Sequence, residues 1–304
     1  MKVVLTGITG FIGSNLAEKL IAEKNEVHAI VRATSKVSEL SESLQKNVKF
    51  HVYDENHTIM DLMTKLSQNS KPDVVYHLAS LYLPNHKYED IKELIESNVN
   101  FGTKILDAMK ENGITNFVNT GTFAQHYEDR NYSPVNLYSA TKQCFEDILK
   151  LYVEMHDIKS ISLHLFDTYG PNDKRPKIFN LFKKIGDSGE TLKMSPGEQL
   201  INIVYIDDIV DAFILAGKYL AEGRYDLCGT YGVSSGNPIR LRDLAKIFEN
   251  VSGKKLSIEW GGRPYRDREI MIPWTSYKLL PNWKPKVSLE EGIKKFMSAL
   301  DGKE

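Results

Sequence analysis

The amino-acid sequence predicts an α/β protein in which parallel strands alternate with helices, followed by a smaller mixed region. Short apolar runs typical of buried strands alternate with helical patterns over about the first 165 residues. The first such run, Val3–Thr6, leads directly into a glycine-rich turn and a helix. Beyond Pro171 the regular alternation ends, and prolines and glycines separate shorter elements.

The expected elements of the first half follow one another as strand and helix. The strands are Val3–Thr6, Glu26–Val31, Val48–Tyr53, Asp73–His77, Asn116–Thr120 and Ile161–Phe166, and the helices begin near Phe11 or span Asp61–Gln68, Lys87–Asn112 and Leu137–His156. Because crossovers between parallel strands are right-handed, this order predicts a doubly wound parallel sheet of the Rossmann-like type. Ligands of such sheets bind at the carboxyl ends of the strands.

The second half has fewer regular elements. We expect helices at Ile206–Leu220, Leu241–Val251 and Leu289–Leu300, and strands near Leu200–Tyr205 and Leu256–Trp260. These patterns predict a Rossmann-type domain over residues 1–170, to which residues 203–228 return. Residues 171–304 are then expected to form a substrate-binding region.

Composition limits the partners and the location. The chain has 304 residues and a formal net charge of −1, which argues against nucleic acid or an anionic membrane surface as a partner. No apolar run approaches the roughly 20 residues of a membrane-spanning helix, and no signal-type segment precedes the first strand. The two cysteines, Cys144 and Cys228, lack metal-ligand spacing, and the histidines are scattered. We expect a cytoplasmic protein without a metal site.

The glycine-rich turn reads Thr6-Gly-Ile-Thr-Gly-Phe-Ile-Gly13. Gly7 suits the tight turn, Gly10 lets the backbone approach a pyrophosphate, and Gly13 lets the helix pack closely on the strand. The helix N-terminus then offers free N–H groups and the positive end of its dipole to phosphates. The pattern predicts a dinucleotide site, and the alternative is a purely structural turn between strand and helix.

A tyrosine and a lysine, Tyr138 and Lys142, stand four positions apart in a helical pattern. They therefore share one helix face, and a nearby ammonium lowers the pKa of a phenol. Such a pair can exchange a proton with a carbonyl or an alcohol. Thr122 lies at the end of the preceding strand, at the sheet edge where the dinucleotide is expected. Taken alone, Tyr138 and Lys142 would also fit a solvated helix face.

In this order the motifs resemble the extended short-chain dehydrogenase/reductase superfamily of NAD(P)-dependent nucleotide-sugar epimerases, dehydratases and reductases. The similarity extends over nearly the whole chain. The matching segments are the glycine turn, His77–Ser80, Asn98–Thr103, Tyr138 with Lys142, Tyr169–Pro171, Tyr205–Asp208 and Trp283–Pro285.

The resemblance implies roles for individual residues. Thr122 would orient the substrate oxygen, Tyr138 would donate or accept the proton, and Lys142 would bind the nicotinamide ribose. Asp54 would bind the adenine amino group, and Asn98 would support the nicotinamide region. The other cofactor contacts that it implies are Gly7, Thr9, Gly10, Phe11, Ile12, Gly13, Leu78, Ala79 and Ser80.

Two departures from the superfamily's pattern bear on the reaction. The 4,6-dehydratases carry an Asp-Glu pair directly after the hydroxyl residue, where this chain has Phe123, so dehydration is not expected. NAD-using relatives hold an acidic residue at the end of the second strand, whereas here Val31 is followed by Arg32. A guanidinium suits a 2′-phosphate. We therefore expect NADP(H) to be preferred, with NAD(H) possible if Arg32 is only a surface cation.

The expected substrate pocket also departs from the pattern. Relatives have Arg near His164, Asn near Asp167 and Arg-Asp at Ile201–Asn202, and no role is assigned to these positions here. Arg266 is the candidate for binding the substrate's diphosphate, because a planar guanidinium can bind phosphate oxygens in pairs. Arg263 and Arg268 are nearby alternatives.

A narrower likeness is to bacterial CDP-abequose and CDP-paratose synthases. It rests on the short segments Met155–Ile158, Gly197–Gln199, Arg266–Ile270 and Trp283–Pro285. It implies NADPH-dependent reduction of the 4-keto group of a nucleotide-diphosphate 4-keto-6-deoxy or 3,6-dideoxy hexose, in deoxysugar and lipopolysaccharide O-antigen biosynthesis. An NAD-dependent nucleotide-sugar 4-epimerase is the alternative, and a non-catalytic NADP(H)-binding sensor is the alternative outside enzymes. Relatives usually dimerise through two long helices, so we expect a homodimer through Lys87–Asn112 and Leu137–His156.

Overall fold

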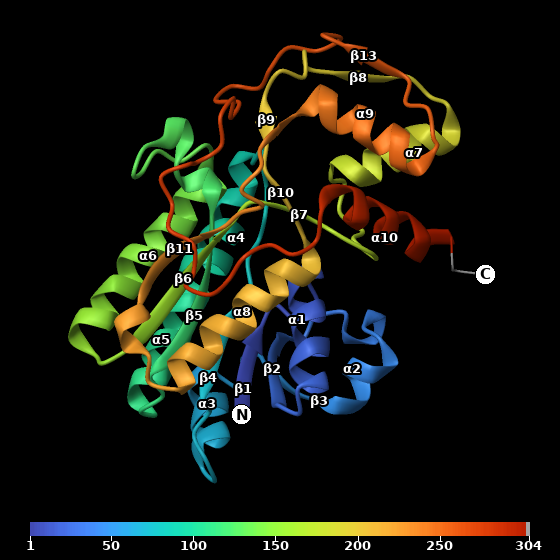
Figure 1. Cartoon of the computed structure of the whole chain (residues 1–304). Helices are drawn as coiled ribbons and strands as arrows, with labels where there is room; N and C mark the ends of the chain where they lie inside the picture. The colour runs from blue at the N-terminus through green and yellow to red at the C-terminus, as the bar shows by residue number, and fades with distance from the viewer. Residues whose placement is uncertain (302–304) are drawn as a thin grey trace.

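A seven-stranded sheet forms the centre of the molecule, in the order β11-β6-β5-β4-β1-β2-β3 (Figure 1). The computed structural model describes residues 1–301. The strands of this sheet are β1 (Lys2–Thr6), β2 (Glu26–Arg32), β3 (Val48–Tyr53), β4 (Val74–His77), β5 (Asn116–Thr122), β6 (Lys159–Leu165) and β11 (Gly229–Val233). All neighbouring strands pair in parallel. The predicted doubly wound parallel sheet is confirmed.

Successive residues of β1 enter two different cores. Val3 and Leu5 belong to the core on one face of the sheet, and Val4 belongs to the core on the other. The first face is covered by α1 (Phe11–Ala22), α2 (Glu42–Asn47) and α8 (Ile206–Ala221), and the second by α3 (Ile59–Ser67), α5 (Phe101–Glu111) and α6 (Leu137–Met155). Burial on both faces explains why the strands appear in the sequence as continuous apolar runs.

The helix expected over Lys87–Asn112 is not one regular α-helix. It consists of a 3-10 turn (Tyr88–Asp90), α4 (Ile91–Ile95), a π turn (Glu96–Asn100) and α5. The π turn contains Asn98, whose side chain is buried. Such turns are frequent at functional sites. The segment ends as predicted, since Gly113 follows it with a φ of +61°.

The second half of the chain builds a smaller lobe beyond the sheet (Figure 1). Its helices are α7 (Ile178–Ser188), α9 (Leu241–Ser252) and α10 (Leu289–Asp301). They meet through Phe179, which stacks on Phe248 and packs against Phe296. The helix α7 is not predicted from the sequence, because Gly186 interrupts its pattern. In the structure this glycine lies inside α7 at a close contact, where a Cβ would be 3.1 Å from the Cβ of Lys254.

Short strands connect this lobe to the sheet. The strand expected at Leu200–Tyr205 is divided into β9 (Leu200–Ile201), antiparallel to β12 (Ile239–Arg240), and β10 (Ile203–Tyr205), parallel to β7 (Asp167–Tyr169). A further pair is formed by β8 (Leu192–Met194) and β13 (Ile258–Trp260). Meanwhile α8 and β11 belong to the main layer. Over residues 1–301, no helix has the length and apolar character needed to cross a membrane.

The carboxyl ends of β1, β4 and β5 are joined by side-chain hydrogen bonds. Thr6 Oγ1 lies 2.9 Å from His77 Nδ1 and accepts a hydrogen bond from the backbone N–H of Ala79 at 3.2 Å. Thr120 Oγ1 donates to the carbonyl oxygen of His77 at 2.8 Å. These contacts hold the segments after the three strands close to one another, and the candidate site is built there.

Candidate active site

The glycine turn after β1 leaves no space for a side chain at Gly7 or Gly13. Gly7 has a φ of +78°, and a Cβ on it would lie 2.6 Å from the backbone nitrogen of Ala79. A Cβ on Gly13 would lie 2.1 Å from the carbonyl oxygen of Gly7. Gly10 is the N-cap of α1 and places no side chain over the helix N-terminus. The turn therefore offers open N–H groups at a helix N-terminus, which fits the pyrophosphate of a dinucleotide.

The other residues expected around the cofactor lie beside this turn. The Leu78–Ala79 backbone packs against Gly7, and Phe11 and Ile12 form the start of α1. Thr9 is part of the exposed tip of the turn. The structure thus brings the residues of the turn and those after β4 to a single edge of the sheet.

Asn98 ties the segment after β4 to the helix α6. Its Oδ1 accepts hydrogen bonds from Ser80 Oγ at 3.2 Å and from the backbone of Leu81 at 2.7 Å. Its Nδ2 donates to the carbonyl oxygen of Leu81 and to Thr141 Oγ1, each at 3.0 Å. Because Thr141 directly precedes Lys142, Asn98 fixes the distance between the loop after β4 and the expected catalytic helix.

Thr122 ends β5 with a buried side chain whose proton is free to be donated. Its Oγ1 accepts a hydrogen bond from the backbone of Ala124 at 3.3 Å, and its own backbone N–H donates to Gln125 Oε1 at 2.9 Å. The hydrogen bond from Ala124 orients the Thr122 hydroxyl, and a hydroxyl that accepts in this way can still donate its own hydrogen. This agrees with the expected task of donating a hydrogen bond to a substrate oxygen.

Tyr138 and Lys142 lie in the first turns of α6, where Asn136 caps the helix. Burial raises the pKa of Tyr138 to about 12, against a hydrogen bond from Ser80 and the nearby charge of Arg175. Burial lowers the pKa of Lys142 to about 8. The sequence predicts that the Lys142 ammonium lowers the pKa of Tyr138. In the structure this effect is not among the main causes of the Tyr138 pKa. At neutral pH the phenol therefore keeps its proton, and the amine is mostly charged.

The positions assigned to the adenosine end of the cofactor are exposed. Arg32 ends β2, and its backbone N–H donates to Ser35 Oγ at 3.0 Å. Among the side chains that the structure describes, those of residues 1–299, none forms an ion pair with its guanidinium. Asp54 follows β3, and its Oδ1 accepts hydrogen bonds from the backbones of Asn56 and His57 and lies 3.0 Å from His57 Nδ1. Asp54 thus closes its own turn through this oxygen.

The three candidate arginines for the diphosphate differ in their surroundings. Arg268 Nη2 donates to Ser133 Oγ at 2.7 Å, and the guanidinium lies 4.3 Å from the centre of the Tyr127 ring. Arg266 stands on an exposed turn, and its backbone N–H donates to Glu269. Since Arg268 already has partners, Arg266 and Arg263 are the better candidates for an anion.

Two cations near the site have no place in the sequence-based predictions. The Arg175 guanidinium lies 4.7 Å from the centre of the Phe11 ring at the glycine turn and pairs with Asp173 at 2.7 Å. Lys177 lies 4.9 Å from the centre of the Tyr82 ring, and that ring meets Tyr138 edge-on at 4.9 Å. The sequence indicates these two cations only through the basic run after Pro171, and such a run is also typical of a solvated surface.

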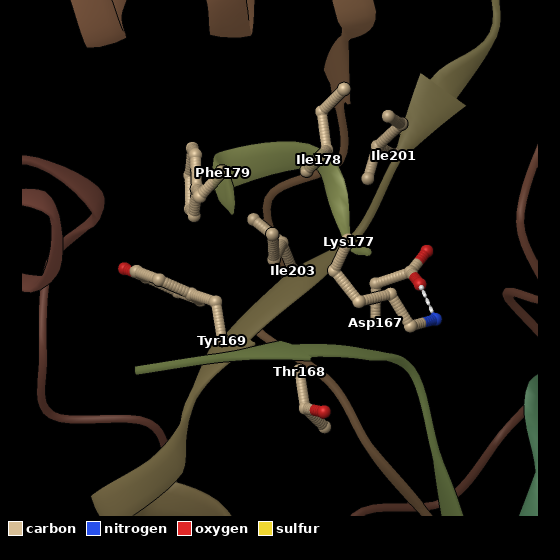
Figure 2. A pocket seen from close by; sticks show the side chains of 8 residues that line it. All are labelled: Asp167, Thr168, Tyr169, Lys177, Ile178, Phe179, Ile201 and Ile203. Atoms are coloured by element: carbon tan, nitrogen blue, oxygen red, sulfur yellow. Dashed lines mark hydrogen bonds and ion pairs between the residues drawn. The ribbon is translucent and has the colours of Figure 1, made fainter. Parts of the chain in front are cut away.

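Lys177 belongs to a small pocket at the start of α7. Its amine is paired with Asp167 Oδ1 at 3.2 Å (Figure 2). The pocket is lined by Asp167, Thr168, Tyr169, Lys177, Ile178, Phe179, Ile201 and Ile203. At Ile201, where relatives carry arginine, the wall is apolar. In residues 1–301 no three His, Cys, Asp or Glu side chains gather in a way that would hold a metal ion.

Residues 3–228 match the model of the NAD dependent epimerase/dehydratase family. The chain belongs to this family. Its fold and glycine turn agree with this membership, so the protein is an enzyme of the NAD-dependent epimerase/dehydratase superfamily.

Two curated relatives and one solved structure show what the chain is similar to. The chain is 32% identical to CDP-abequose synthase of Yersinia pseudotuberculosis, over 94% of this chain and 96% of the relative. It is 26% identical to UDP-glucuronate 4-epimerase of Thermodesulfobacterium geofontis, over 96% and 94%. UDP-glucuronic acid 4-epimerase from Bacillus cereus, solved with UDP-glucuronic acid and NAD, superposes with a TM-score of 0.83 at 23% identity and 99% coverage of both chains. The last likeness concerns the fold alone.

We expect Gly7→Ala to lose most of the affinity for NADPH and NADH, because the added methyl group collides with the backbone at Ala79. The measurement is a fluorescence titration, together with thermal unfolding. Gly223→Ala is the matched control, since Gly223 has a similar φ of +73° and nothing lies within 4 Å of its Cβ position. It should cost about 1 kcal/mol of stability and leave cofactor affinity unchanged. Equal affinity in the two variants would contradict this role of the turn.

Proposed function

We propose that this enzyme reduces the 4-keto group of a nucleotide-diphosphate 4-keto-6-deoxy or 3,6-dideoxy hexose with NADPH. The proposal is supported by the positions of three side chains: Thr122 ends β5, and Tyr138 and Lys142 stand one turn apart at the start of α6, with Tyr138 beside Ser80 of the segment after β4. The identity of 32% to a CDP-abequose synthase, over 94% of the chain, supports this substrate class. The cytidine nucleotide is the first base to test.

Tyr138, Thr122 and Lys142 would each have a separate role in the reduction. The reduced nicotinamide, when bound, supplies a hydride to the carbonyl carbon. Tyr138 donates its phenolic proton to the carbonyl oxygen as this becomes an alcohol, and it recovers a proton from solvent. The Thr122 hydroxyl and the Lys142 ammonium stabilise the negative charge that develops on the oxygen. The phenol pKa of about 12 keeps this proton in place at neutral pH.

Dehydration is disfavoured by the residue next to Thr122. Phe123 stands where the 4,6-dehydratases begin their Asp-Glu pair, and its ring stacks on Phe166 with 5.0 Å between the ring centres. An apolar ring held in this way offers no acid or base for eliminating water. The epimerase alternative stays open, because a relative that covers nearly the whole chain is a 4-epimerase, and the same tyrosine would serve that reaction.

Substrate reduction is tested by the loss of the NADPH absorbance with CDP-, dTDP- and GDP-linked 4-keto-6-deoxy sugars. We expect turnover with at least one of them, and Tyr138→Phe to lower kcat by at least about 100-fold while NADPH still binds. An epimerase would instead retain NAD(H) through gel filtration and consume no NADPH. A sensor would bind NADPH without turnover and would be indifferent to Tyr138→Phe. No oxidation with any of the sugars would refute the reductase.

We also propose that Arg32 selects NADP(H) by binding the 2′-phosphate. Its exposed guanidinium has no ion-pair partner among the described side chains of residues 1–299, and charge-assisted hydrogen bonds to phosphate are strong. Arg32→Ala should weaken NADPH binding about ten-fold and leave NADH binding unchanged, as measured by calorimetry. Arg224→Ala removes an arginine that pairs with Asp226 and serves as the control. An unchanged ratio of the two affinities in Arg32→Ala would rule out this role.

A homodimer through α4, α5 and α6 is a further proposal. Apolar side chains on these helices are exposed, at 42% for Ile95, 53% for Leu151 and 67% for Met155. Sedimentation equilibrium should give a dimer, and Leu151→Lys should shift it to monomer because a charge would be buried in the interface. Leu279→Lys changes a similarly exposed leucine elsewhere, at 44%, and should stay dimeric. A monomeric wild type, or equal behaviour of the two variants, would contradict this interface.

A further inference from the structure

A buried chain of ionisable side chains lies behind the catalytic helix. Glu146 is one turn after Lys142 on α6, and its Oε1 lies 2.7 Å from His164 Nε2 on β6. His164 Nδ1 lies 2.9 Å from Nε2 of His126, whose Nδ1 lies 3.2 Å from the carbonyl oxygen of Arg130. Both histidines are less than 9% exposed.

The hydrogen-bond partners of the two imidazoles determine which ring nitrogens carry a hydrogen. The Glu146 carboxylate and the Arg130 carbonyl can only accept, so His164 Nε2 and His126 Nδ1 must each carry a hydrogen. The contact between the two rings needs one further N–H, on either imidazole. Burial lowers the pKa of His126. The two histidines thus extend the hydrogen-bonded network from Glu146 to the Arg130 backbone.

Glu146 is held as a carboxylate by further donors. Asn119 Nδ2 donates to its Oε1 and Gln125 Nε2 to its Oε2, each at 3.1 Å. Burial raises the pKa of Glu146, but His164 and Gln125 outweigh it and hold this pKa below its usual value. The register of β5 on β6 pairs Gly121 with His164, and a Cβ there would lie 2.2 Å from the His164 ring. The strand that ends in Thr122 is thus shaped around this pair.

We propose that Glu146 is a positioning residue that keeps Lys142 in its charged form at the pH at which the enzyme works. The two residues share one face of α6, four positions apart. Lys142 is 1% exposed and forms no ion pair within 4 Å in the described part of the chain. A buried ammonium needs a nearby negative charge, and the Glu146 carboxylate raises the pKa of Lys142 against the effect of burial. This inference rests on the ribose-binding role proposed for Lys142.

The other titratable groups that face the pair do not replace this carboxylate. His77, on β4, is neutral because burial lowers its pKa to about 3, and Tyr138 keeps its proton. His164 contacts Glu146 through Nε2 and supplies no negative charge. Glu146 is thus the anion behind the catalytic lysine. Without it the amine loses its proton at a lower pH, because burial then acts on it with less opposition.

The test follows NADPH affinity from pH 7 to pH 10 by fluorescence titration, which needs no sugar substrate. Wild-type affinity should fall above about pH 8, where Lys142 loses its proton. Glu146→Gln should move this fall to lower pH by about one unit. Glu146→Asp, which keeps the charge, should restore most of the wild-type profile. Asp147→Asn is the matched control, because it removes an exposed charge from the neighbouring position of α6, and its profile should not move.

A folded Glu146→Gln protein with the wild-type profile would overturn the proposal. If this variant does not fold, the double variant Lys142→Met/Glu146→Gln decides, because an uncompensated ammonium is then gone. Recovery of folding by the double variant supports the charge pairing, and failure of both shows that Glu146 is needed only for its hydrogen bonds. Since all these readouts are binding and folding, a lack of reductase activity would leave them unaffected.

Discussion

The close fit of the glycine turn against the segment after β4 is the constraint on which the site depends. There is no space for a Cβ at Gly7 or Gly13, so strand, turn and helix approach until backbone meets backbone. The same edge then receives Ser80, which borders Tyr138, and Asn98, which links that segment to α6. One local packing requirement thus brings the N-terminus of α1 and the segment beside Tyr138 of α6 to the same edge of the sheet, as the proposed reduction requires.

Burial separates the acid–base properties of two side chains that stand one turn apart on α6. The same low-polarity surroundings raise the pKa of Tyr138 and lower that of Lys142, since in each case the charged form is disfavoured. A phenol that keeps its proton is suited to donate it only when negative charge appears on a substrate oxygen. Because the pKa of Lys142 lies close to neutral pH, its charge depends on nearby groups. Glu146, which raises this pKa and is held in place by His164, therefore belongs to the proposed site.

The sequence predicts the sheet, the turn and the placement of Tyr138 and Lys142 one turn apart on a helix, because each depends on a pattern within a few residues. The contacts of Glu146 with His164 and of Lys177 with Asp167 could not be predicted, because each joins two elements and depends on how they pack. His164 reaches Glu146 only because the register of β5 and β6 places it beside Gly121. The π turn at Asn98 was also missed, since its residues are as helical in pattern as their neighbours. The roles assigned to the individual site residues, from Thr122, Tyr138 and Lys142 to Arg32, Asp54 and Arg266, stay predictions.

The most direct test of the proposed reduction is a single turnover with NADPH deuterated at the transferable C4 position and a CDP-4-keto-6-deoxy sugar, with mass spectrometry of the product. We predict one deuterium in the sugar for each NADPH oxidised, and a transfer at least about 100-fold slower in Tyr138→Phe. A 4-keto sugar that gains no deuterium and oxidises no NADPH would contradict the reduction, and inversion at C4 of a CDP-hexose by protein that retains NAD(H) would assign the site to epimerisation.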